Sequence, residues 1–115
     1  MNLPHESVLL RVFVGESDAH GGRPVYEQIV FKARELNLAG ATVLRGTMGF
    51  GASSRVHTAK FLRLSEDLPI IIEIVDTEDR IQPLLEYIDD VVREGIVTIE
   101  RVRVISYRHR EGEGR

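Results

Sequence analysis

Residues 68–95 have the sequence LPIIIEIVDTEDRIQPLLEYIDDVVREG, which predicts a strand followed by an amphipathic helix. The strand is rich in β-branched residues, which favour extended backbone. Thr77 is suited to cap the helix, and the two acids after it suit the positive end of the helix dipole. Apolar residues then recur every three or four positions up to Gly95, which predicts one core-facing stripe. Pro83 predicts that the regular helix begins near it, after a 3₁₀ turn, or is distorted there.

The first half of the chain has the same plan: a strand, a polar turn, a helix and a second strand. Residues 7–14 are almost continuously apolar and predict a central strand. Pro24 suits the first turn of a helix over about 24–38, because its missing N–H would have no partner there. Gly40 lies where a left-handed C-terminal cap is expected, and residues 41–45 predict a short strand.

A last strand is predicted over 96–107. The apolar positions in its first half are out of phase with those in its second half, which predicts a bulge or break near Glu100. Residues 108–115 are polar and glycine-containing, and we expect them to form a flexible tail.

This order of elements predicts an α+β fold, a ferredoxin-like βαββαβ sandwich with a four-stranded antiparallel sheet and two helices on one face. We expect a single domain over 1–115 with a core over about 7–107. The strands over 7–14 and 68–75 are apolar on both faces, although two helices cover only one of them. The sequence therefore predicts an oligomer in which sheet faces pack together.

The composition narrows the class of protein. The 115 residues have a formal net charge of -3 and no Cys, so disulfides and thiolate metal sites are excluded. A mildly acidic chain, with a pI of about 5.8, is not expected to bind nucleic acid. Apolar runs long enough for a membrane helix and a signal peptide are both absent, and we expect a cytoplasmic protein.

The charges are distributed unevenly along the chain. Residues 36–65 contain no acid, whereas residues 66–94 contain ten. Four cations, Arg45, Arg55, Lys60 and Arg63, give the acid-free segment a local charge of +4. This segment is therefore the candidate for contacts with an anion.

Much of that segment is a glycine-rich loop. Glycines let backbone N–H groups turn toward an anion, and the nearby cations add charge, so the loop is a candidate phosphate- or acid-binding element. A solvated hairpin loop without a specific role is the alternative. The spacing does not fit a P-loop, and a GXXG RNA-binding motif would join two helices. The candidate ligand-binding residues here are Arg45, Gly46, Gly49, Gly51, Arg55, His57 and Lys60.

The last strand adds two basic candidates. Arg101 and Arg103 share one face of it, and Arg108 and Arg110 would share the face of a continuation. These cations are suited to bind an anion or to pair with the acidic second helix, and we favour pairing for at least some of them.

Catalytic and metal-binding patterns are weak. Glu16, Asp18 and His20 lie close together after the first strand, where acid–base chemistry is one reading and capping of the local turn is the one we favour. If the protein is an enzyme, His57 is a further candidate for a catalytic side chain. The four histidines have no metal-ligand spacing, so a metal site would have to be assembled in space.

Several motifs together resemble a known family. Residues 10–18 (LRVFVGESD), 40–46 (GATVLRG), 49–57 (GFGASSRVH) and 65–69 (SEDLP) look like the proteins grouped as domain of unknown function 190, within the PII-like superfamily. The resemblance covers about residues 7–107. It implies a ferredoxin-like fold, a homotrimer with sheets facing inward, and a long loop between the second and third strands.

The resemblance also implies a function. PII signalling proteins contact partners through the long loop and bind adenine nucleotides in clefts between subunits. Arg45 and Gly46 stand where that loop begins, and Arg101 and Arg103 resemble the basic pair of the last PII strand. The glycine-rich phosphate loop of PII is reduced here to residues 93–95, and the long loop has no Tyr for uridylylation.

The leading hypothesis is a trimeric PII-like regulator that binds a small anion, with ATP, ADP, AMP or a cyclic nucleotide as candidate ligands. Its 46–66 loop would contact a partner protein. Association of some family members with a fluoride and camphor-resistance membrane protein family makes a membrane transporter a candidate partner. The alternatives are an enzyme that acts on a phosphorylated small molecule at the subunit cleft, and a CutA-like metal-tolerance module.

Overall fold

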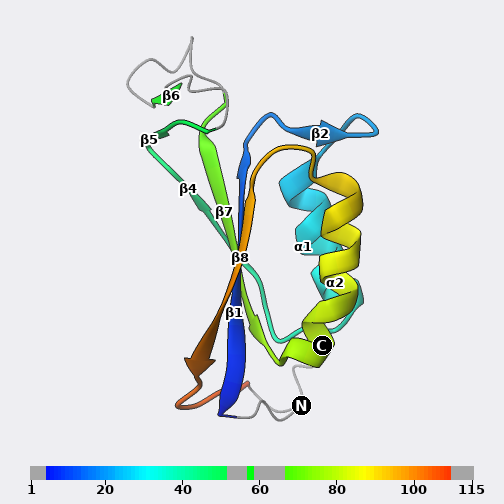
Figure 1. Cartoon of the computed structure of the whole chain (residues 1–115), viewed down its shortest axis with the longest axis vertical. Coiled ribbons are helices and arrows are strands. Elements are labelled where there is room, and N and C mark those ends of the chain that lie inside the picture. Colours follow the sequence, from blue (N-terminus) through cyan, green and yellow to red (C-terminus); the bar gives the residue numbers. More distant parts are fainter. Residues whose placement is uncertain (1–4, 52–56, 59–66, 110–115) are drawn as a thin grey trace.

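The computed structural model describes residues 5–51, 57–58 and 67–109. A sheet and a layer of two helices lie side by side, and both helices pack on the same face of the sheet (Figure 1). The predicted order of the main strands and helices is confirmed, and the chain has the α+β, ferredoxin-like sandwich. Within the described residues, no helix is long and apolar enough to cross a membrane.

The sheet consists of β1 (Glu6–Gly15), β4 (Thr42–Arg45), β7 (Pro69–Asp76) and β8 (Ile96–Arg103). Their order is β4-β7-β1-β8, and every neighbouring pair is antiparallel. The two most apolar strands, β7 and β1, are therefore central, as their composition predicted.

The helix α2 spans Glu78–Val91 and begins as predicted. The hydroxyl of Thr77 accepts a hydrogen bond from the Arg80 N–H at 3.4 Å, which caps the first turn. Pro83 lies inside the helix, so the alternative in which the helix starts near Pro83 is wrong. Because the Thr77 carbonyl already accepts the Ile81 N–H at 3.1 Å, the first turn is closed before Pro83 is reached.

The helix α1 spans Val25–Glu35 and is shorter than predicted, because the chain leaves it at Asn37 rather than at Gly40. Asn37 has a φ of 60°, a left-handed conformation that asparagine tolerates better than most residues. The Leu38 N–H bonds back to the Ala33 carbonyl at 3.1 Å, as in a Schellman motif.

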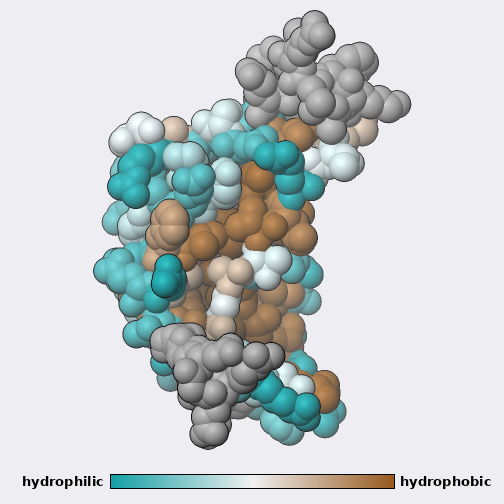
Figure 2. All heavy atoms as spheres, turned by 180° about the vertical axis from the view of Figure 1, so that it is seen from behind, coloured by the Kyte–Doolittle hydropathy of each residue, from teal (hydrophilic) through white to brown (hydrophobic). Residues whose placement is uncertain are grey.

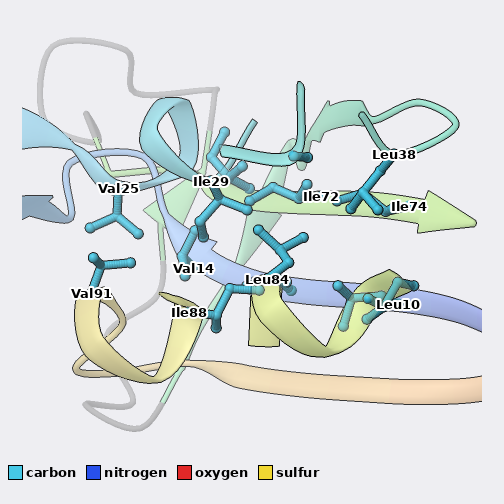
Figure 3. Packing of buried hydrophobic residues seen from close by; sticks show 14 of the residues in the cluster. Leu10, Val14, Val25, Ile29, Leu38, Ile72, Ile74, Leu84, Ile88 and Val91 are labelled. Atoms are coloured by element: carbon cyan, nitrogen blue, oxygen red, sulfur yellow. The ribbon is translucent and has the colours of Figure 1, made fainter. Parts of the chain in front are cut away.

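The core lies between the helices and the sheet (Figure 3). Every second residue of β1 and β7 faces the helices and is buried. Leu10, Ile72 and Leu84 are completely buried, and burial of each such side chain is worth about 1.5–3 kcal/mol relative to exposure. The main contributors are Val8, Leu10, Val12, Val14, Val25, Ile29, Ala33, Ile70, Ile72, Ile74, Ile81, Leu84, Ile88 and Val91.

Two segments predicted as loops contain short strand pairs. β2 (Ala19–His20) pairs with β3 (Arg23–Pro24) in the turn before α1. The side-chain amide of Gln28 donates hydrogen bonds to the carbonyls at both ends of that turn. β5 (Met48–Gly49) pairs with β6 (His57–Thr58), which brings the start of the long loop back to its middle.

The predicted bulge near Glu100 is wrong. β8 pairs with β1 in an unbroken register from Glu6 opposite Arg103 to Phe13 opposite Ile96. No residue is inserted into the strand. The apolar pattern shifts because Val97 and Ile99 lie on the face that carries the helices, whereas Val102 lies on the opposite face. The strand also ends at Arg103, so the predicted extension to residue 107 is not part of it.

The sheet face away from the helices is apolar and has no covering element among the described residues. The register places Leu9 and Phe13 of β1 beside Val75 and Ile71 of β7 on this face, and all four are half-buried. Leu44 of β4 and Ile96 of β8 extend the surface on either side. We call these six residues the open face: Leu9, Phe13, Leu44, Ile71, Val75 and Ile96. Apolar residues also gather over a broad area on the back of the molecule (Figure 2).

A group of three charged side chains, Arg11, Glu73 and Glu100, lies on the same side of the sheet as the open face. The Arg11 guanidinium donates to Glu73 at 2.9 Å and to Glu100 at 2.8 Å. The hydrogen bond that Arg11 donates to Glu73 raises the pKa of Arg11, against a smaller lowering by desolvation, and the charges of Glu100 and Glu73 add to the increase. The single cation of this face is thus compensated by two carboxylates, and both faces of β1 and β7 are largely apolar, as predicted.

Candidate ligand-binding site

The base of the long loop is held by backbone contacts to β7. The Gly46 N–H donates to the Pro69 carbonyl at 2.7 Å. A Cβ atom on Gly46 or Gly49 would lie 3.0 or 2.9 Å from the Pro69 ring. At these two positions glycine is therefore explained by close packing against Pro69, without an anion.

Arg45, the first predicted cation of this segment, is already paired. Its guanidinium forms a hydrogen-bonded ion pair with Glu16, which follows β1. The charge available at the loop base is therefore smaller than the local +4 of the sequence suggests, since the Glu16 carboxylate comes from outside the acid-free segment.

The other predicted loop residues contribute little to a site in the described part of the chain. Gly51 is exposed, and a Cβ atom there would meet nothing within 4 Å. His57 is placed only through its strand pairing with Gly49. Arg55 and Lys60 lie outside the described residues.

The acids after β1 have structural roles. The Asp18 carboxylate accepts the Gly15 N–H at 2.9 Å and thereby closes the turn, as we favoured from the sequence. The Asp67 carboxylate accepts the Ser17 N–H at 2.8 Å and ties this turn to the end of the long loop. Among the described residues no hydrogen bond or ion pair joins the side chains of His20 and Asp18, and no group of three His, Asp or Glu side chains is arranged to hold a metal ion.

Arg101 and Arg103 share one face of β8, as predicted, and both are exposed. They stand opposite Val8 and Glu6 of β1, on the side of the sheet that carries the helices. In residues 5–51, 57–58 and 67–109 neither arginine forms an ion pair, and Arg108 forms none either, so pairing with α2 is not found for these three.

A hollow of about 680 Å³ lies at the end of the molecule opposite the loop base. Its walls are the last turns of α1, residues 37–41 and residues 107–109. We call it the C-terminal hollow. The floor is apolar, the basic side chains at its walls are those of Arg34, Arg108 and His109, and the lining residues include no carboxylate. Such a lining suits an anion that also carries an apolar or aromatic part.

The C-terminal segment is fixed to this hollow by Tyr107. The Tyr107 hydroxyl donates to the Ala39 carbonyl at 3.1 Å, and its ring lies 6.1 Å from the ring of His109, centroid to centroid. The same contact holds Arg108 at the hollow that Arg34 of α1 also lines. A backbone excursion after β8 thus brings together cations that are distant in sequence.

A second, smaller hollow of about 340 Å³ lies between the end of α2 and the start of β8. It includes Arg93, Glu94 and Gly95, which the family resemblance implies to be the reduced counterpart of a phosphate loop, but its lining also includes Asp89. Two carboxylates against one arginine make it a poorer anion site than the C-terminal hollow.

The sequence therefore located the candidate site incompletely. It singled out Arg101 and Arg103 on the strand, whereas the basic groups gathered around a hollow are Arg34, Arg108 and His109. The sequence indicated Arg108 as a basic residue on a continuation of the last strand. It could not place Arg108 at the hollow, because β8 ends earlier than predicted, at Arg103. The run of three consecutive basic residues at positions 108–110 was the available signal.

Residues 7–104 match the family described as DUF190, "Uncharacterized ACR, COG1993". This chain belongs to the DUF190 family. A UPF0166 protein of Aquifex aeolicus is 37% identical over 97 residues, which cover 84% of this chain and 91% of the relative. A UPF0166 protein of Methanocaldococcus jannaschii is 33% identical over 92 residues, which cover 79% and 84% of the two chains.

Solved structures confirm the PII-like fold of this DUF190 protein. CPII of Thiomonas intermedia, in a structure bound to ADP and bicarbonate, matches with a TM-score of 0.65 at 17% identity, over 86% of this chain and 88% of CPII. A GlnK–ATP complex of Bacillus subtilis matches with a TM-score of 0.55 at 9% identity, over 88% and 85% of the chains. CPII is described as a nitrogen regulatory PII-like protein.

Proposed function

We propose that this DUF190 protein is a PII-like regulator that binds an adenine nucleotide in the C-terminal hollow. The observation that carries the proposal is the lining of that hollow, which combines an apolar floor with Arg34, Arg108 and His109 and has no carboxylate. CPII in complex with ADP and AMP, and GlnK in complex with ATP, have this fold. Phosphates suit arginine because its planar fork donates two hydrogen bonds at once.

The open face supports a homotrimer with inward-facing sheets, as the family resemblance implies. Its apolar side chains would leave water on assembly, and its one cation, Arg11, already has two carboxylate partners. The family resemblance implies that the ligand is bound between subunits. Arg45 lies at the loop base, at the opposite end of the molecule from the hollow, and is paired with Glu16, so it is not part of the proposed site.

The long loop is the proposed contact to a partner protein, with a membrane transporter as the candidate. Met48 and Phe50 support this role, because 63% and 70% of their surfaces are exposed at the start of the loop. Large exposed apolar side chains on a projecting segment are typical of protein-binding surfaces.

Removal of Arg108 is expected to weaken ADP binding about tenfold to a hundredfold, the loss expected for one charge-assisted hydrogen bond to phosphate. Isothermal titration of the trimer with ATP, ADP, AMP and cyclic nucleotides would measure it, with Arg108→Ala compared against the wild type. Arg45→Ala should have a smaller effect, because the Arg45 charge is already compensated by Glu16.

Arg101→Ala is the matched control, since Arg101 is equally basic and exposed on β8 but does not line the hollow. The proposed site would be wrong if Arg101→Ala abolished binding while Arg108→Ala bound like the wild type. Absence of heat with every nucleotide at millimolar concentration would contradict a nucleotide ligand altogether.

A further inference from the structure

A buried carboxylate lies behind the wall of the C-terminal hollow. Asp76, the last residue of β7, is completely buried. Its carboxylate accepts hydrogen bonds from the Ala39 N–H at 2.9 Å, the Thr77 N–H at 2.7 Å and the Arg80 Nε at 3.1 Å. A carboxylate in such a place is retained only when its charge and its lone pairs are well satisfied, and here both are.

Arg80 extends this contact to a second point of the same wall. While its Nε is bonded to Asp76, another nitrogen of its guanidinium donates to the Asn37 carbonyl. Asn37 is the residue with positive φ that turns the chain out of α1. Asp76 and Arg80 therefore hold residues 37–39 at both the Asn37 carbonyl and the Ala39 N–H, and we call this pair the clip.

The clip also keeps negative charge away from the hollow. The Asp76 carboxylate is offset by the Arg80 cation and by two N–H groups, and it has no exposed surface. Arg80 itself lies on the first turn of α2 and does not line the hollow, so it is not a ligand-binding group.

We infer that Asp76 and Arg80 are positioning residues for the ligand, which hold the wall formed by residues 37–39 in the shape that binds it. This role rests on the proposed binding function of the C-terminal hollow. Besides its backbone hydrogen bonds to α1, the wall has two side-chain attachments among the described residues, the clip and the Tyr107 hydroxyl. The clip is the one made by residues outside the hollow.

The test uses Arg80→Lys and Asp76→Asn in the full chain. Lysine keeps the charge but cannot reach Asp76 and the Asn37 carbonyl with one planar group. Asparagine keeps the shape of Asp76 but places an NH₂ group where an acceptor is needed. We expect about tenfold faster hydrogen exchange at the Ala39 amide and about tenfold weaker ADP binding for either variant.

Val91→Ala is the matched control for stability, because Val91 is buried in the same core but lies at the far end of it from Leu38 (Figure 3). It should lower the melting temperature and leave both the Ala39 exchange rate and the ADP affinity unchanged. A structural role alone would make the clip variants behave as Val91→Ala does. If Asp76→Asn fails to fold, Arg80→Lys still decides, since the Arg80 side chain is 40% exposed.

The two proposals fail in different ways. If the wild type binds ADP and Arg80→Lys binds it equally well, the positioning role is wrong and the binding site stands. If the wild type binds no ADP, the binding function is wrong and the positioning role falls with it.

Discussion

Replacement of Ile71 by Asp is expected to convert the proposed homotrimer to monomers, with a threefold fall in mass by light scattering. Ile71 lies in the middle of the open face, opposite Phe13 on β1 and Leu44 on β4. In a protomer it is only half-buried, so a carboxylate there remains hydrated and the fold is retained. In a trimer with inward sheets three carboxylates would be buried, at a cost of several kcal/mol each.

Phe31→Asp is the matched control, because it makes the same apolar-to-acid change on α1, where Phe31 is 56% exposed and away from the sheet. This variant should assemble like the wild type. A wild-type chain that is itself monomeric would contradict the homotrimer, and a trimeric Ile71→Asp variant would show that another surface is used.

Replacement of Gly95 by Ala is expected to destabilise the fold by about 3 kcal/mol or more, from backbone strain and overpacking together. Gly95 joins the end of α2 to the start of β8 with a φ of 149°, which side chains rarely adopt. A Cβ atom there would lie 2.3 Å from the Phe13 carbonyl oxygen. Since that oxygen belongs to a central strand, the backbone cannot easily move away.

Urea unfolding followed by circular dichroism would measure the loss, with Gly40→Ala as the control. Gly40 has no positive φ, and a Cβ atom there meets nothing within 4 Å, so alanine should be neutral or stabilise by up to about 1 kcal/mol. Equal midpoints for the two variants would contradict the strain assigned to Gly95.

The sequence predicted the fold well because each main element carries its own pattern. The run of β-branched residues in β7 and the three-to-four spacing in α2 identify one strand and one helix, and Thr77 identifies where the helix begins. The errors arose where the pattern is ambiguous. Gly40 was expected to cap α1, but Asn37 tolerates the same conformation and comes earlier. The phase change near Glu100 indicated two apolar faces rather than a bulge.

The candidate site was harder to predict, for a physical reason. Charge can be counted along the chain, but compensation depends on residues that meet in space. Arg45 is paired with Glu16, 29 positions away. The net charge at the base of the acid-free segment is therefore less positive than the count of its own residues suggests. Conversely, Arg34 and Arg108 gather at one hollow only because Tyr107 fixes the C-terminal segment to Ala39.

The edge strand β8 has a consequence for solubility. A sheet edge leaves backbone donors and acceptors open to any other strand, and eight residues of edge would be enough to nucleate aggregation. The end of β8 carries Glu100, Arg101 and Arg103, all exposed. Charged side chains discourage pairing between the edges of two sheets. Association through the sheet face would instead give a closed ring of fixed size, whereas edge-to-edge pairing could extend into fibres.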